Sequence, residues 1–270
     1  MTAAFLADPP CKGSNGFCSP STDSFIFKPF VKWEWFGVHF EVNKLTILIW
    51  IGIAAIAAFF LYATRRVTLV PSKAQWMAEE TYGFVRNGIG EEVIGHDGVR
   101  FAPYLATLFV FVLVTNLFGI IPFAQISPNS HIAYPAFLAI ISWIIYNWLG
   151  IRKHGFIGYF KGIMFPPGIP WPIYIILAPI EFISTVLVRP VTLAVRLFAN
   201  MFAGHLILLV FTLGGIYLLS VHNFSKIFSI PAFIMAIALT FLEVIVQVLQ
   251  AYVFTVLTAS YIQGALAEEH

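Results

Sequence analysis

The chain has 270 residues, of which 59% are hydrophobic and only 10% are charged, and its formal net charge is +2. A soluble domain carries about 25% charged residues, so these side chains cannot cover a surface in water and the bilayer must be the main solvent. The small net charge and the lack of a long basic run exclude a nucleic-acid partner. The first residues show no basic segment followed by an apolar core, so no signal peptide is predicted.

The pattern of apolar residues predicts the fold class. Backbone groups have no water to bond in the hydrocarbon, so only helices or a closed barrel span a membrane. The apolar runs are about 20 residues long and do not alternate with polar residues, which indicates helices. We therefore predict an all-α integral membrane protein with about five membrane helices and one amphipathic surface helix.

The predicted elements follow one another along the chain. They are an extramembrane tail at 1–43 and a membrane domain at 44–270 that contains a first span at 45–64, a surface helix at 72–94, further spans at 101–126 and 132–151, and two long helices at 173–213 and 231–264. Ser72 is a candidate cap for the surface helix. Pro179 and Pro190 interrupt the first long helix, and Gly214 and Gly215 are expected to begin a turn. Both long helices exceed the roughly 20 residues needed to cross, so strong tilt is expected.

Basic residues predict the orientation. The loops at 65–100 and 152–172 hold most of the Lys and Arg residues that lie between spans, so the positive-inside rule assigns them to the cytoplasm. The N-terminal tail then lies outside and the C-terminus lies in the cytoplasm. Outside, Cys11 and Cys18 would meet an oxidising compartment, where they either form a disulfide or remain ordinary tail cysteines.

Several ionisable and amide side chains interrupt the last two apolar segments: Glu181, Arg189, Arg196, Asn200, His205, Glu243, Gln247 and Gln250. A charge at the bilayer centre costs about 2.5–3.5 kcal/mol, and four unpaired charges would cost roughly 10 kcal/mol. Glu181 and Arg189 are close enough to a helix end to reach the interface. Arg196 stands in the middle of its segment, so this explanation fits it poorly.

The spacing of these residues places them on helix faces. Arg196 and Asn200 are four residues apart and share one side of a helix, and Glu243, Gln247 and Gln250 form a stripe on another helix. Two such stripes on neighbouring helices indicate either a water-lined path or a hydrogen-bonded seam that holds the helices together. The seam explains the amides but not Arg196.

The chemistry of the residues divides them into two groups. An arginine stays protonated in proteins, so Arg196 sets an electric field but cannot relay a proton. Glu181, His205 and Glu243 can each gain and lose a proton. A permanent cation between titratable groups blocks a simple proton wire. A carboxyl group on a neighbouring subunit would carry the proton past Arg196 if it were neutral in lipid and ionised beside the arginine.

Three stretches resemble one protein family. The signature of subunit a of F-type (rotary) ATP synthases of the bacterial type is closely resembled by residues 189–205, RPVTLAVRLFANMFAGH. The last helix of that family is resembled by residues 243–258, EVIVQVLQAYVFTVLT. Its second-span motif is resembled by residues 115–122, TNLFGIIP. The resemblance covers about residues 45–265.

The resemblance implies a role for each site residue. Arg196 matches the essential arginine that faces the carboxylates of a rotating c-subunit ring, while Asn200 and Gln250 match its neighbouring polar residues. His205 and Glu243 match the pair in the outer half-channel, where family members occur in either order, and Asn116 would lie near them. Glu181 resembles the carboxylate of the inner half-channel, although its distance to Pro190 is one residue longer than in many relatives.

The implied function is that of a proton-channel stator. Protons would enter through His205 and Glu243, neutralise a ring carboxylate, and leave by way of Glu181 after rotation. A potential of 100 mV supplies about 2.3 kcal/mol per proton, so several protons are needed per ATP. The implied partners are the c-subunit ring, the peripheral-stalk b subunits, the rest of the ATP synthase and membrane lipid, in the inner (cell) membrane of a bacterium.

Other classes of function fit less well. A self-contained secondary transporter would be expected to show an internal repeat, and the sequence has none. A structural assembly subunit would tolerate neutral residues at Arg196 and Glu243. An enzyme is the least supported class, because no nucleophile motif and no metal cluster at zinc spacing is visible. We therefore expect a non-catalytic subunit without a metal or cofactor.

Overall fold

The computed structural model describes residues 31–35, 38–65, 68–121, 124–164, 171–220 and 224–267. Within these ranges the prediction of an all-α membrane protein is confirmed, because five helical stretches are long and apolar enough to cross a membrane. They are Lys44–Thr64, Gly98–Leu117, Ala133–His154, Ile173–Leu219 and Lys226–Leu266. The two tail cysteines lie outside the described residues.

A short β-hairpin precedes the first span. Strands β1 (Val31–Trp35) and β2 (Val38–Val42) pair antiparallel, with Val31 opposite Val42 and Trp35 opposite Val38. Apolar and polar residues alternate along both strands, which is the sequence pattern of a β-strand. This segment was predicted only as part of the extramembrane tail, and the hairpin was not predicted.

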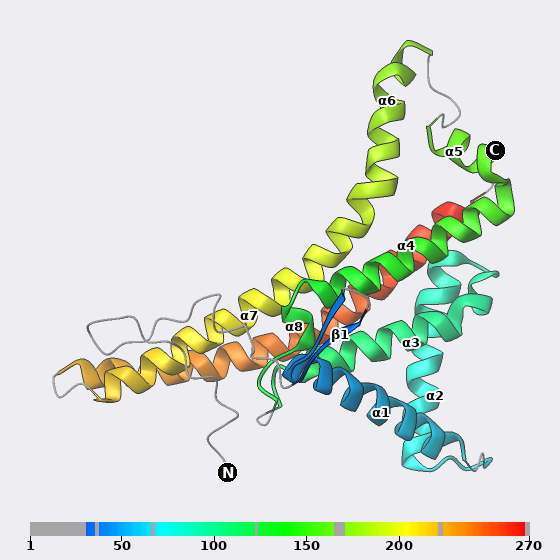
Figure 1. Cartoon of the computed structure of the whole chain (residues 1–270). Helices are drawn as coiled ribbons and strands as arrows, with labels where there is room; N and C mark the ends of the chain where they lie inside the picture. Colours follow the sequence, from blue (N-terminus) through cyan, green and yellow to red (C-terminus); the bar gives the residue numbers. More distant parts are fainter. Residues whose placement is uncertain are drawn as a thin grey trace. The chain divides into compact units, whose positions relative to one another are not determined.

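The helices pack as two compact units, each built from segments far apart in the sequence. The first unit takes in 1–54, 113–131 and 199–249, and the second takes in 55–112, 132–198 and 250–270. Helices α1 (Lys44–Thr64), α3 (Gly98–Leu117), α7 (Arg189–Ser220) and α8 (Ser229–Leu266) contribute residues to both units. These four helices are labelled in Figure 1.

In the first unit, capping residues and polar turns decide where two helices start and stop. Asn43 caps α1, since its Oδ1 accepts hydrogen bonds from the backbone N–H and the hydroxyl of Thr46, both at 3.0 Å. Helix α3 ends at Leu117, not at 126 as expected. Beyond it the Ser127 hydroxyl donates to the Thr115 carbonyl at 2.9 Å, so a side chain takes over a carbonyl at the helix end.

The first unit also brings α7 and α8 together as long neighbouring helices (Figure 1). Helix α7 continues through Gly214 and Gly215 to Ser220, so the turn begins later than predicted. Gly215 serves as a packing site, because a Cβ there would lie 3.3 Å from the Phe233 ring. The Ser229 hydroxyl donates to the Gly215 carbonyl at 3.0 Å. Gly215 therefore allows close approach of the two helices.

The second unit contains several shorter helical segments as well as parts of the spans. Helix α2 (Lys73–Val85) begins at Ser72, whose side chain accepts from the Gln75 N–H, which confirms the predicted cap. A π-helical segment, Arg86–Ile94, follows it directly. Helix α4 (Ala133–His154) is joined to α5 (Phe156–Met164) through Gly155, which has a φ of 75°, a conformation that glycine adopts at little cost.

A π-helical turn connects α6 (Trp171–Ile183) to α7 in the same unit. It spans Ser184–Val188, and the Arg189 N–H donates to the Ser184 carbonyl five residues back. In this register the next donor would be Pro190, which has no N–H. The Thr185 carbonyl is instead bonded by the Tyr146 hydroxyl at 3.1 Å. A π turn takes up about one more residue than an α turn, and this turn lies between Glu181 and Pro190.

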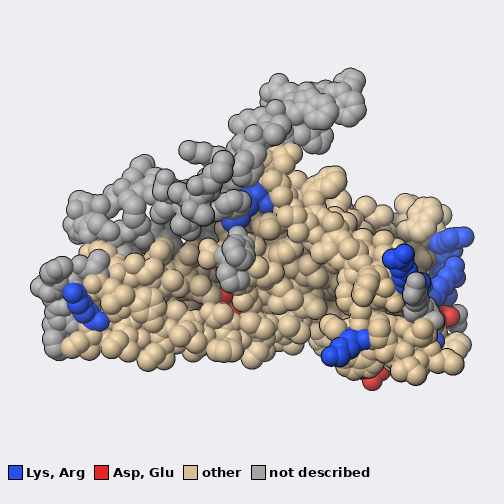
Figure 2. Space-filling model, turned by 90° about the horizontal axis from the view of Figure 1, so that it is seen from below, with Lys and Arg blue, Asp and Glu red and all other residues tan. Residues whose placement is uncertain are grey.

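The surface of the molecule is suited to lipid. In Figure 2, Lys, Arg, Asp and Glu side chains form only small patches on a face dominated by uncharged residues. Large apolar side chains are widely exposed along the spans, among them Trp50 at 72%, Leu61 at 71% and Phe241 at 69%. Such exposure would be unfavourable in water, so the hydrocarbon of a membrane is the solvent that these faces fit.

The bond from Tyr146 to Thr185 leads to a prediction. Tyr146→Phe should destabilise the second unit by about 1–3 kcal/mol, because a buried carbonyl loses its donor. The measurement is the loss of folded protein on heating in detergent. Tyr252→Phe is the matched control, since no described residue bonds the Tyr252 hydroxyl. Equal stability of the two variants would contradict the role of Tyr146.

Candidate functional site

Titratable and amide side chains gather in the buried part of the first unit. His205 on α7 is 8% exposed, and Glu243 on α8 is 6% exposed. Helix α7 approaches the Glu243 carboxyl at Gly204, where a Cβ would lie 3.5 Å from Oε1. Because His205 follows Gly204 directly, the predicted outer pair starts from adjoining turns of two packed helices.

Only one oxygen of the Glu243 carboxyl accepts a hydrogen bond from the described residues. The Gln247 Nε2 donates to its Oε1 at 3.4 Å, from one helical turn further along α8. The other oxygen, Oε2, is buried and has no hydrogen-bond partner among the described residues. A buried carboxyl with one occupied and one open oxygen is equipped to take up a proton at the open oxygen.

Asn116 lies fully buried at the end of α3 and links that helix to α8. Its Nδ2 donates to the Gln247 carbonyl at 3.2 Å, and its Oδ1 accepts from the Asn129 Nδ2 at 2.7 Å. Asn129, in a 3₁₀ turn at Pro128–Ser130, was not among the predicted site residues. The only sequence signal for it is a short polar run between two apolar spans.

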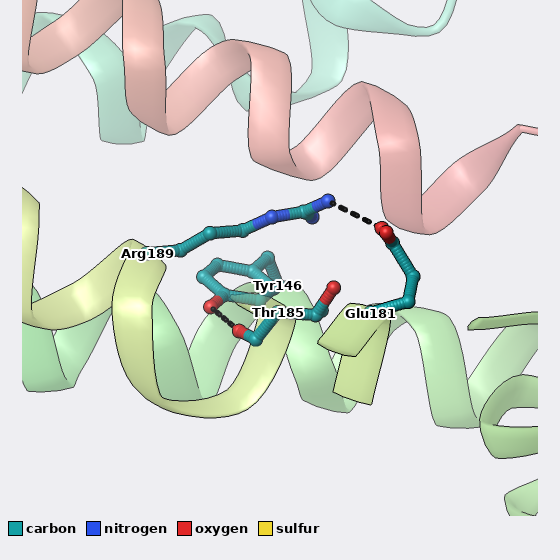
Figure 3. Close-up of polar contacts among 4 residues, drawn as sticks. All are labelled: Tyr146, Glu181, Thr185 and Arg189. Atoms are coloured by element: carbon teal, nitrogen blue, oxygen red, sulfur yellow. Dashed lines mark hydrogen bonds and ion pairs between the residues drawn. The ribbon is translucent and has the colours of Figure 1, made fainter. Parts of the chain in front are cut away.

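A second polar cluster lies in the second unit around Arg189. The Arg189 Nη2 is 3.8 Å from the Glu181 Oε1, and both side chains are about one-third exposed, at 31% and 37%. Figure 3 shows the two side chains reaching toward each other above Tyr146 and Thr185. The guanidinium also lies 5.5 Å from the centre of the Tyr261 ring, within the range of a cation–π contact.

The π turn explains how Glu181 and Arg189 meet. They are eight residues apart, about 2.2 turns of a regular α-helix, which would point them in different directions. The wider π turn between them brings both positions onto one face. Glu181 therefore has a local counter-charge that its spacing from Arg189 in the sequence does not predict.

An aromatic hydroxyl on α5 borders this second cluster. The Tyr159 hydroxyl donates to the Asn147 Oδ1 at 3.1 Å. Burial raises the pKa of the Tyr159 phenol, against the opposing charge of Arg189. Tyr159 therefore stays protonated at neutral pH and acts as a hydrogen-bond donor.

Arg196 differs from every residue above. It lies on α7 with its side chain exposed, and Asn200, one turn later, is exposed as well. Within the described ranges no residue forms a hydrogen bond or ion pair with Arg196. The α8 stripe is buried by contrast, with Glu243 at 6%, Gln247 at 0% and Gln250 at 4% exposure. The described residues also contain no group of three side chains able to hold a metal ion.

Comparisons with known proteins point to one family. The family model of the ATP synthase A chain matches residues 46–263. A protein named ATP synthase subunit a from Nocardioides sp. is 49% identical over 88% of this chain and 87% of its own length. Proteins of the same name from Rhodococcus erythropolis and Streptomyces lividans are 45% and 43% identical, each over 94% of this chain and over 92% and 90% of their own lengths. The chain therefore belongs to the ATP synthase subunit a family.

Proposed function

We propose that this chain is the proton-channel stator of an ATP synthase. It would provide two aqueous half-channels that load and unload protons on a ring of c subunits, and so couple proton flow to rotation and ATP synthesis. In this role it is non-catalytic and needs no cofactor. The observation that carries the proposal is Arg196, an exposed cation in a long apolar helix with no partner in the described part of the chain.

The free-energy cost of placing a charged side chain in the bilayer explains why Arg196 needs a partner. A charge near the centre of a bilayer costs about 2.5–3.5 kcal/mol on insertion scales, and arginine does not become neutral. A carboxylate on a neighbouring subunit would offset this cost when it faces Arg196. The same carboxyl must be neutral while it faces lipid, so each passage past Arg196 requires the loss and gain of a proton. Asn200 lies on the same exposed part of α7 and offers a neutral hydrogen-bonding group beside the cation.

The outer half-channel is assigned to the buried cluster of the first unit. His205 and Glu243 are titratable, and Glu243 keeps one oxygen open. The Gln247 amide donates to this carboxyl, and the Asn116 amide donates to the backbone carbonyl of Gln247, and neither amide exchanges protons itself. A proton would pass through this pair to a carboxylate of the ring.

The inner half-channel is assigned to Glu181. Its side chain is 37% exposed and lies 3.8 Å from Arg189, so it has both access to its surroundings and a counter-charge. The exposure makes the ion pair weak, which suits a carboxylate that must accept a proton and release it. Gln250, buried on α8 in the same unit, is the remaining polar residue assigned to the path.

One hydrogen bond supports the proposed orientation. The Lys153 Nζ donates to the Leu266 carbonyl at 2.7 Å, so the basic end of α4 and the C-terminal end of α8 lie on the same side. The positive-inside rule assigns that side to the cytoplasm. The chain would then sit in the plasma membrane of a bacterium, with its N-terminal tail outside and the peripheral-stalk b subunits as further partners.

Replacing Arg196 tests the central role directly. Arg196→Lys should abolish proton pumping, because lysine can lose its proton and lacks the planar guanidinium. The measurement is ATP-driven acidification of inverted vesicles that contain the assembled complex. Arg152→Ala removes an exposed arginine at the end of α4 and should pump normally. Normal pumping by Arg196→Lys would refute the assigned role.

Replacing Glu243 tests the outer half-channel. Glu243→Gln should slow proton flow by roughly a hundredfold or more, because a proton-transfer group usually contributes about 10²–10⁴. The measurement is passive proton conduction through vesicles after removal of the soluble part of the complex. Glu92→Gln, which alters an exposed carboxylate in the segment after α2, is the control. Conduction at the control rate would remove Glu243 from the path.

A further inference from the structure

We infer that Asn129 is a positioning residue of the outer proton path. It fixes the amide of Asn116, which in turn holds α8 at Gln247. The Gln247 amide then binds one oxygen of Glu243 and leaves the other open to receive a proton. This inference rests on the proposed function and assigns a role to a residue in the turn between α3 and α4.

Hydrogen bonds link the side chain of Asn129 to that of Asn116, and that of Asn116 to the backbone of Gln247. The acceptor at Gln247 determines which group donates in each bond. The backbone carbonyl of Gln247 can only accept a hydrogen bond. The Asn116 atom that lies 3.2 Å from it must therefore be the amide nitrogen, Nδ2. The Asn116 oxygen then points to Asn129 and accepts from its Nδ2 at 2.7 Å. Reversing either amide would place two donors or two acceptors against each other. Asn129 thus enforces the one orientation of Asn116 that binds α8.

Asn129 is itself held firmly enough to act in this way. It is 1% exposed, and its Nδ2 also donates to the Thr115 hydroxyl at 2.9 Å. Its backbone N–H donates to the Ser127 hydroxyl at 3.2 Å, and that hydroxyl donates to the Thr115 carbonyl at 2.9 Å. The turn is therefore bonded to the end of α3 at several points, and the side chain of Asn129 has little freedom to rotate.

The other end of the chain of amides reaches the carboxyl. The Gln247 Nε2 donates to the Glu243 Oε1 at 3.4 Å, and Oε2 has no partner among the described residues. Gly119 makes room for this amide, since a Cβ there would lie 3.1 Å from Nε2. With α8 held in place at Gln247, the Gln247 amide selects Oε1, and Oε2 is left as the atom that takes up the proton.

The test is passive proton conduction by intact membrane sectors in vesicles, driven by an imposed gradient. Asn129→Leu keeps a similar volume but removes the N–H donors, and conduction should fall roughly tenfold, or about 1.4 kcal/mol, within the range for a lost buried hydrogen bond. Ser130→Ala removes the bond from Ser130 to the Ser127 carbonyl in the same turn and should conduct normally. If Asn129→Leu does not assemble, Asn129→Ser, which is too short to reach Asn116, should show the same loss.

A double-substitution experiment separates positioning from a merely structural role. In complexes that already carry Asn116→Leu, adding Asn129→Leu should cause no further loss, because Asn129 acts through Asn116. Additive losses, or full conduction by Asn129→Leu, would overturn the inference. Glu243→Gln serves as the reference. If it conducts normally, the proposed outer path fails as well. If it is slow while Asn129→Leu is normal, only the role of Asn129 fails.

Discussion

The cost of placing charge in hydrocarbon is the constraint on which the rest of this structure depends. Each charged group in the spans requires a counter-charge, hydrogen bonds or contact with water. Glu181 has Arg189 at 3.8 Å, and Glu243 has the Gln247 amide at 3.4 Å. Arg196 has neither among the described residues. We therefore expect the partner of Arg196 to come from another subunit of the complex.

The helices keep the polar groups in place through local departures from ideal geometry. The π turn at Ser184–Val188 aligns Glu181 with Arg189, and the Tyr146 hydroxyl replaces the donor that Pro190 lacks. Gly204 and Gly215 let α7 and α8 approach closely where Glu243 and Phe233 face them. Each of these features would weaken an ordinary helix. Here each is offset by a specific contact, and π turns of this kind often occur at functional sites.

The sequence predicted the helical spans well because length and uninterrupted apolar character depend only on the thickness of the bilayer. It predicted some helix ends poorly, because these depend on side chains that are distant in the sequence. Helix α3 stops at Leu117, where Ser127 and Asn129 bond its last turn. Helix α7 passes through Gly214 and Gly215, and Phe233 of α8 packs against it at Gly215. In a membrane, a glycine can be a site of close helix packing as readily as the start of a turn.

The sequence also indicated some residues of the candidate site and not others. Charged and titratable residues within apolar segments stand out in a sequence, so Arg196, His205 and Glu243 could be proposed from the sequence alone. Asn129 was missed because a polar residue in a turn is the ordinary expectation, and only the folded chain shows that it is buried against Asn116. The pairing of Glu181 with Arg189 was missed because an α-helical spacing of eight residues does not bring two side chains together.

The central claim is that the face of α7 around Arg196 contacts a carboxylate-bearing ring, and disulfide cross-linking tests it most directly. One cysteine would replace Ala199, which is exposed on α7 near Arg196, and the other would lie one helical turn from the membrane carboxylate of a c subunit. The comparison position is Leu61→Cys, exposed on α1. The account predicts rapid cross-linking from position 199 in the assembled complex and little from position 61. Cross-linking from position 61 but not from position 199 would contradict it.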